Sequence, residues 1–111
     1  MTPPLFEWFS IDSDDHQVTI SANPPGGEVW THAFAWESVI RVCFKAGGPF
    51  DQDELYVFTA VRPESFVIPM EASGAPSFLD ELMTRGLFPA EQSIQAAMME
   101  EGEILCWPPA E

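Results

Sequence analysis

The sequence predicts an α+β fold: an antiparallel sheet or roll of about six strands, followed by two short helices and a final strand. Segments of strand length are separated by Gly- and Pro-containing turns about every 10 to 15 residues, which is typical of antiparallel sheets. After Met70 the hydrophobic period changes from that of a strand to that of a helix. The length of 111 residues indicates a single domain spanning 1–111.

The six expected strands lie between the turns, at 6–11, 18–22, 28–34, 40–45, 55–61 and 65–70. In the fourth strand, alternation places Ile40, Val42 and Phe44 on one face. Residues 55–61 are apolar on both faces and predict a central strand. Pro69 lacks a backbone N–H, so we expect a sheet edge, a bulge or the end of the strand there.

Two helices and a last strand follow. The first helix is expected to begin near Ser77, whose S-x-x-D pattern is typical of an N-terminal cap, and to end at Gly86. The second is expected from Pro89 to about Glu100, because proline is favoured in the first turn of a helix. Residues 103–107 are then expected to form the final strand.

The charge excludes several classes of function. The chain has 18 Asp and Glu against 4 Lys and Arg, a formal net charge of −14. So few basic residues cannot form the basic stripe that phosphate binding needs, so we expect no direct nucleic-acid binding and no binding to anionic membranes. The hydrophobic fraction of 46% is too high for a disordered acidic tail.

The sequence also predicts the compartment. No apolar stretch approaches the roughly 18 residues of a membrane span, and no secretory signal is visible, so we expect a cytoplasmic protein without a membrane segment. Cys43 and Cys106 lie in apolar segments. We therefore expect two reduced, buried thiols rather than a disulfide.

No pattern predicts catalysis, a cofactor or a metal site. His16 and His32 have no H-x-x-x-H or C-x-x-C partner spacing, and the acidic run 12–15 lacks the glycine and terminal glutamate of a calcium loop. Neither a G-x-S-x-G motif nor a phosphate-binding glycine loop is present. We therefore expect no metal, no cofactor and, on balance, no enzymatic activity.

One stretch of the chain, 36–82, resembles a known family. The residues that carry the resemblance are WESVI at 36–40, LYVF at 55–58, FVIPM at 66–70 and FLDEL at 78–82. With them the chain resembles small, uncharacterised bacterial domains with a pleckstrin-homology-like roll, particularly the YcxB-like type. The resemblance implies such a β-roll with an Ile-Pro step leading into a closing helix, and no catalytic residue.

The chain departs from that family at two points. YcxB-like proteins usually carry membrane helices, which this sequence lacks, and a basic residue often follows the Ile-Pro step where this chain has Met70. Together with the scarcity of Lys and Arg, these departures argue against binding of lipid headgroups.

The leading hypothesis is a non-catalytic interaction or regulatory protein that binds another, basic protein, as an inhibitor, an immunity protein or a DNA mimic does. A strongly acidic surface speeds encounter with a basic partner. Carboxylates in turns project into solvent. The candidate partner-binding residues are therefore Asp12, Asp14, Asp15, Asp51, Asp53 and Glu54, with a further acidic group at Glu100, Glu101 and Glu103.

Two alternatives stay open. One is a small ligand-binding or enzymatic roll whose apolar pocket is lined by Trp30, His32, Phe58 and Met70. The other is an uncharacterised domain whose acidity serves only solubility. The four tryptophans fit core packing, or one or two of them are exposed anchors for a partner. The sequence also leaves open whether the chain forms a homo-oligomer.

Overall fold

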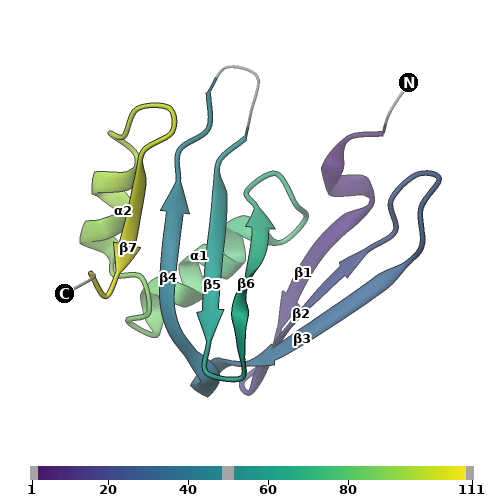
Figure 1. Ribbon diagram of the computed structural model, residues 1–111, viewed down its shortest axis with the longest axis horizontal. Helices are drawn as coiled ribbons and strands as arrows, with labels where there is room; N and C mark the ends of the chain where they lie inside the picture. Colours follow the sequence, from purple (N-terminus) through teal and green to yellow (C-terminus); the bar gives the residue numbers. More distant parts are fainter. Residues whose placement is uncertain (1–2, 49–51, 110–111) are drawn as a thin grey trace.

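The computed structural model describes residues 3–48 and 52–109. Within these ranges the chain forms two antiparallel sheets and two α-helices, which confirms the α+β prediction (Figure 1). The elements are η1 (Leu5–Glu7), β1 (Phe9–Ser13), β2 (Gln17–Ala22), β3 (Trp30–Ala35), η2 (Trp36–Ser38), β4 (Val39–Lys45), β5 (Glu54–Thr59), β6 (Arg62–Pro69), α1 (Ala75–Thr84), α2 (Ala90–Ala96) and β7 (Ile104–Trp107).

The first sheet has the strand order β1-β2-β3 and the second has the order β6-β5-β4-β7. The predicted central strand, β5, lies inside the second sheet, and the edge strand β6 ends at Pro69, as expected from the missing N–H. In Figure 1 the two sheets diverge like the sides of a V, and both helices lie behind the second sheet.

Both sheets contribute to one hydrophobic core. Val18 and Ile20 from β2 are buried against a second set from β5 and β6, and the helical region closes the core with Leu82 and Phe88. Trp36 lies at the corner between the sheets. Its ring stacks on Phe78 at 5.6 Å between centroids, and its indole N–H donates to the Asp14 carbonyl at 2.8 Å.

The helix boundaries differ from the prediction. Helix α1 begins at Ala75, two residues before the expected cap at Ser77. Gly74 precedes it with φ 86°, and a side chain there would overlap the Ile11 carbonyl oxygen, so a close approach to β1 sets this start. Helix α2 ends at Ala96, well short of Glu100, because tight turns follow it and lead the chain back to β7.

A β-bulge changes the predicted face of β4. The pairing with β5 shifts register between Val39 and Arg41. Val42 and Phe44 are buried as expected, but Ile40 is 58% exposed because the bulge displaces it from their face.

The expectation of two reduced thiols is wrong. Strand β7 pairs antiparallel with β4 and places Cys106 directly opposite Cys43, and the two form a disulfide. They are 63 residues apart in sequence, and no local pattern showed that the last strand would pair with β4. Over 3–48 and 52–109, no helix has the length and apolarity needed to span a bilayer.

Candidate functional site

Carboxylates from three connections of the second sheet meet at one end of the molecule. Their segments lead into β5, join β6 to α1 and join α2 to β7. We call this region the acidic end and define it by Asp53, Glu54, Glu71, Glu100, Glu101 and Glu103. Glu54 is half-buried, and the other five residues are exposed.

Hydrogen bonds on both sides of the end of β4 hold the acidic end together. The Ala46 N–H donates to the Glu103 carbonyl at 3.0 Å, and the Ala46 carbonyl accepts from Gly102 at 2.9 Å. The next residue, Gly47, donates its N–H to the Asp53 carboxylate at 2.7 Å. The acidic segments 53–54 and 100–103 are therefore neighbours in space although they are far apart in the sequence, which the sequence did not reveal.

Two more contacts tighten this arrangement. A side chain at Gly48 would overlap the Glu101 carboxylate, so that carboxylate lies directly against the backbone. The Glu71 N–H donates to the Gln52 side chain at 3.0 Å, which joins the β6–α1 turn to the same end. Lys45 is the basic residue at this end of β4, and it forms no ion pair with any described residue.

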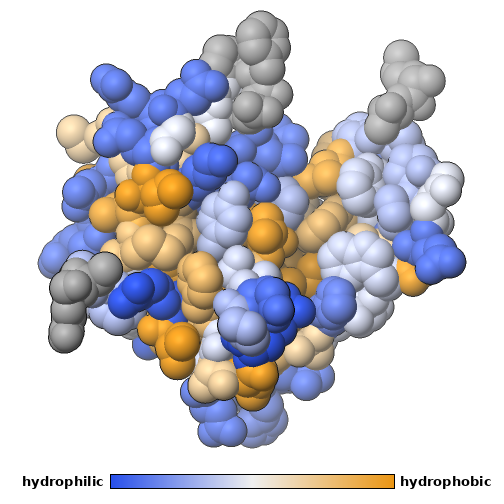
Figure 2. Space-filling view, in the orientation of Figure 1, coloured by the Kyte–Doolittle hydropathy of each residue, from blue (hydrophilic) through white to orange (hydrophobic). Residues whose placement is uncertain are grey.

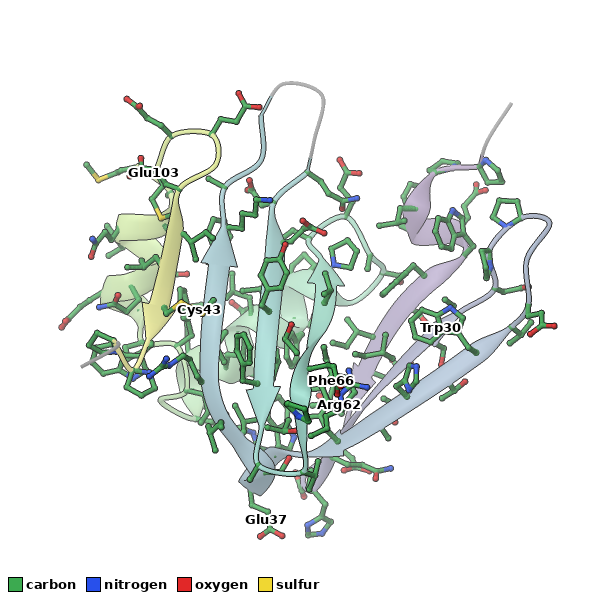
Figure 3. All side chains as sticks on the ribbon, viewed as in Figure 1. Trp30, Glu37, Cys43, Arg62, Phe66 and Glu103 are labelled. Atoms are coloured by element: carbon green, nitrogen blue, oxygen red, sulfur yellow. A yellow bond between two sulfur atoms is a disulfide. The ribbon has the colours of Figure 1, made fainter. Side chains whose placement is uncertain are left out.

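The carboxylates of the β1–β2 turn lie at the opposite end. Figure 3 shows Glu37 at this end and Glu103 at the other. The Asp14 carboxylate accepts the backbone N–H groups of Gln17 and His16, each at 2.8 Å, and these bonds hold the pKa of Asp14 below its ordinary value. The predicted partner-binding residues therefore do not form one site, and Asp51 lies outside the described residues.

A basic residue also compensates the acidic charge at this second end. Arg85 pairs with Glu81 at 2.8 Å and lies over the Trp36 ring, with 4.3 Å from Cζ to the ring centroid. The Arg85–Glu81 pair is the sole ion pair among the described residues. Among the described residues, the carboxylates of the acidic end form no ion pair.

A second candidate site is the cleft between the two sheets. It has a volume of about 320 Å³, and Figure 2 shows hydrophobic surface where the sheets diverge. The cleft is lined by Phe9, Ile20, Trp30 and His32 from the first sheet and by Arg62, Phe66, Val67 and Pro69 from β6.

The pairing of β2 with β3 positions the first wall. Trp30 is opposite Ala22 and His32 is opposite Ile20, so both rings share the buried face of the sheet. The Trp30 ring contacts His32 at 4.9 Å and Phe9 at 5.7 Å between centroids. Because the sheets diverge at this end, Trp30 is 38% exposed although it lies on the core face.

Arg62 forms the polar part of the second wall. Its Cζ lies 3.6 Å from the centroid of the Phe66 ring, a cation–π geometry. Its Nε donates to the Glu64 carbonyl at 3.0 Å and its Nη2 to the Ser65 carbonyl at 3.1 Å. No described carboxylate pairs with Arg62 or lines the cleft. Figure 3 shows Trp30 on one side of the cleft and Arg62 and Phe66 on the other.

Two of the four residues predicted from the sequence to line a pocket do line the cleft. Trp30 and His32 line the cleft, but Phe58 points to the other face of β5, between the buried Val57 and Thr59, and Met70 packs at the margin of the core. Arg62 was missed because 62–64 was expected to form a turn, whereas β6 already begins at residue 62.

The chemistry of the remaining side chains is limited. Cys43 is disulfide-bonded and has no free thiol. Over the described residues, no group of three or more His, Cys, Asp and Glu is arranged to hold a metal ion. Burial and, second, the hydrogen bond to Glu54 raise the pKa of the Tyr56 phenol above its ordinary value, on the outer face of the second sheet.

In comparisons with known proteins, no family model, no curated protein and no solved structure matched this chain. The resemblance to pleckstrin-homology-like domains stays a prediction from the sequence. The proposals below rest on the residues themselves.

Proposed function

We propose that this chain is a non-catalytic interaction protein that binds a basic protein through its acidic end. The observation that supports the proposal is the hydrogen-bonded gathering of two distant acidic segments and Glu71 around the end of β4. Such a concentration of negative charge attracts a basic partner from a distance and disfavours acidic ones.

The clustering also favours binding over solubility alone. Solubility requires only net charge, which dispersed carboxylates provide without close repulsion. Here exposed carboxylates converge on one end, where their mutual repulsion opposes folding. A basic partner that neutralises them would relieve this repulsion on binding.

The test is capture of partners from the native lysate at low salt, with charge-neutral variants as bait. We choose Glu71→Gln, Glu100→Gln and Glu101→Gln in one chain, because these side chains form no hydrogen bond with a described residue. Wild-type bait is expected to retain a basic protein that the triple variant loses. The complex should dissociate in about 1 M salt, where the Debye length is about 3 Å.

A matched triple variant at the opposite end controls for net charge. Asp12→Asn, Asp15→Asn and Glu37→Gln remove the same charge from exposed positions near the β1–β2 turn. This variant should retain the basic protein. The proposal is wrong if both triples lose it equally, if neither does, or if the wild type retains no basic protein at low salt.

Three finer points belong to this proposal. An inhibitor, an immunity protein and a DNA mimic differ in which site of the partner they occupy, so the captured partner distinguishes them.

Cytoplasmic location stays an expectation, and the Cys43–Cys106 disulfide favours an oxidising compartment instead. Alkylation of thiols at the moment of lysis decides between the two, and sedimentation of the purified chain determines whether it self-associates.

A further inference from the structure

We propose that the cleft between β3 and β6 binds a small aromatic monocarboxylate. The ring of the ligand lies against the exposed part of Trp30, and its carboxylate pairs with Arg62. This site is separate from the acidic end, and the proposal does not depend on the proposed function.

The size of the cleft sets the class of ligand. A volume of about 320 Å³ is at the lower end of the roughly 300–1,000 Å³ typical of small-molecule sites. It suits one or two ring systems. The hollow beside Arg41, an arginine that also forms no ion pair with a described residue, has only about 80 Å³, room for two or three waters at about 30 Å³ each.

The walls favour an aromatic body. Phe9, Trp30, His32 and Phe66 line the cleft, Trp30 is the most exposed of its large aromatic rings, and aromatic groups pack well against such rings in offset or edge-to-face geometry. Trp30 keeps 38% of its surface exposed on the face where its neighbours on β2 are buried. A ring placed between the walls would cover that surface.

The charge of the cleft determines the sign of the ligand. Arg62 is the one charged residue among the lining residues, and His32 beside it offers a ring N–H as a second donor. Two backbone carbonyls and the Phe66 ring hold the guanidinium in place, and its other N–H groups donate to no described residue. This guanidinium pairs with no described carboxylate, so it suits a carboxylate from outside, bound in the two-pronged geometry that arginine favours.

Three ligands of the same shape and different charge test this. They are 3-phenylpropionate, 3-phenylpropan-1-ol and 3-phenylpropylamine, measured by isothermal titration calorimetry and by the fluorescence of the protein's tryptophans. We expect the acid to bind about tenfold more tightly than the alcohol, because charge-assisted hydrogen bonds are about twice as strong as neutral ones. The amine should bind more weakly than the alcohol because it meets the guanidinium.

Arginine variants identify the site. Arg62→Gln should weaken binding of 3-phenylpropionate about tenfold and leave binding of the alcohol unchanged. Arg85→Gln removes an arginine that is outside the cleft and should leave both unchanged. Circular dichroism verifies that each variant folds. If Arg62→Gln does not fold, Arg62→Lys keeps the charge without the planar fork and should reduce the preference for the acid over the alcohol.

Several results would overturn the proposal. Equal affinities for the acid and the alcohol would show that Arg62 does not bind the carboxylate. Equal losses of affinity for the acid in the Arg62→Gln and Arg85→Gln variants would show the same. Tighter binding of N-acetyl-Gly-Gly-Phe than of 3-phenylpropionate would make a peptide terminus the occupant. Absence of binding of the acid at millimolar concentration would exclude the site.

Discussion

The two ends of the molecule carry similar acidic turns but use them differently. At the β1–β2 turn, the Asp14 carboxylate is bonded to two backbone N–H groups, and nearby Arg85 pairs with Glu81. At the acidic end, Asp53 and Glu103 also accept backbone N–H groups, but the carboxylates of Glu71 and Glu101 form no hydrogen bond with a described residue, and Lys45 forms no ion pair with one. Acidic residues in turns thus have two roles here: they stabilise a turn locally, or they create a field directed outward.

The disulfide should produce the largest difference between the ends. Changing both cysteines to alanine removes the crosslink between β4 and β7, which joins residues 63 apart, so the free energy of unfolding should fall by about 2–4 kcal/mol. Urea denaturation measures this loss. Hydrogen exchange should accelerate most in β7 and around Gly102 and Glu103, and least in the β1–β2 turn. Uniform acceleration would show that the acidic end is not a separate unit.

Neutralising charge should have a smaller effect on stability and should also differ between the ends. Glu71→Gln, Glu100→Gln and Glu101→Gln together should raise the melting temperature by a few degrees at low salt, because like charges at the acidic end repel. The gain should shrink as salt is added, because screening removes the same repulsion in the wild type. Thermal melts at two ionic strengths test this.

The matched triple at the other end provides the comparison for that melt. Asp12→Asn, Asp15→Asn and Glu37→Gln remove charges near the Arg85–Glu81 pair, where the carboxylates are partly compensated. Their gain should be smaller. An equal or larger gain would mean that repulsion is spread evenly over the surface.

The smallest expected effect is the contribution of Asp14 to stability at acidic pH. Since the pKa of Asp14 is lowered in the folded state, its stabilising contribution is present above its ordinary value of 3.8 and is lost as the pH falls through the folded-state value. Asp14→Asn keeps an acceptor oxygen but cannot titrate. Melting temperatures from neutral pH to below 3.8 should therefore fall more steeply in the wild type than in the variant. Parallel curves would show that titration of Asp14 does not contribute to the loss of stability at low pH.

Local patterns in the sequence predicted most of the fold. Alternation and turn residues located the strands, and two of the four candidate pocket residues, Trp30 and His32, line the cleft. What the sequence could not predict depends on pairings between distant segments. The pairing of β7 with β4 created both the disulfide and the acidic end, and the start of β6 at Arg62 placed a cation in the cleft.

The disulfide also divides the chain covalently. With Cys43 joined to Cys106, residues 43–106 form a closed loop that contains every residue of the acidic end, while the three strands of the first sheet lie on an open tail. A single proteolytic cut inside the loop leaves one covalent molecule, whereas a cut in the tail releases a fragment. The acidic end is therefore carried on the part of the chain that survives nicking intact.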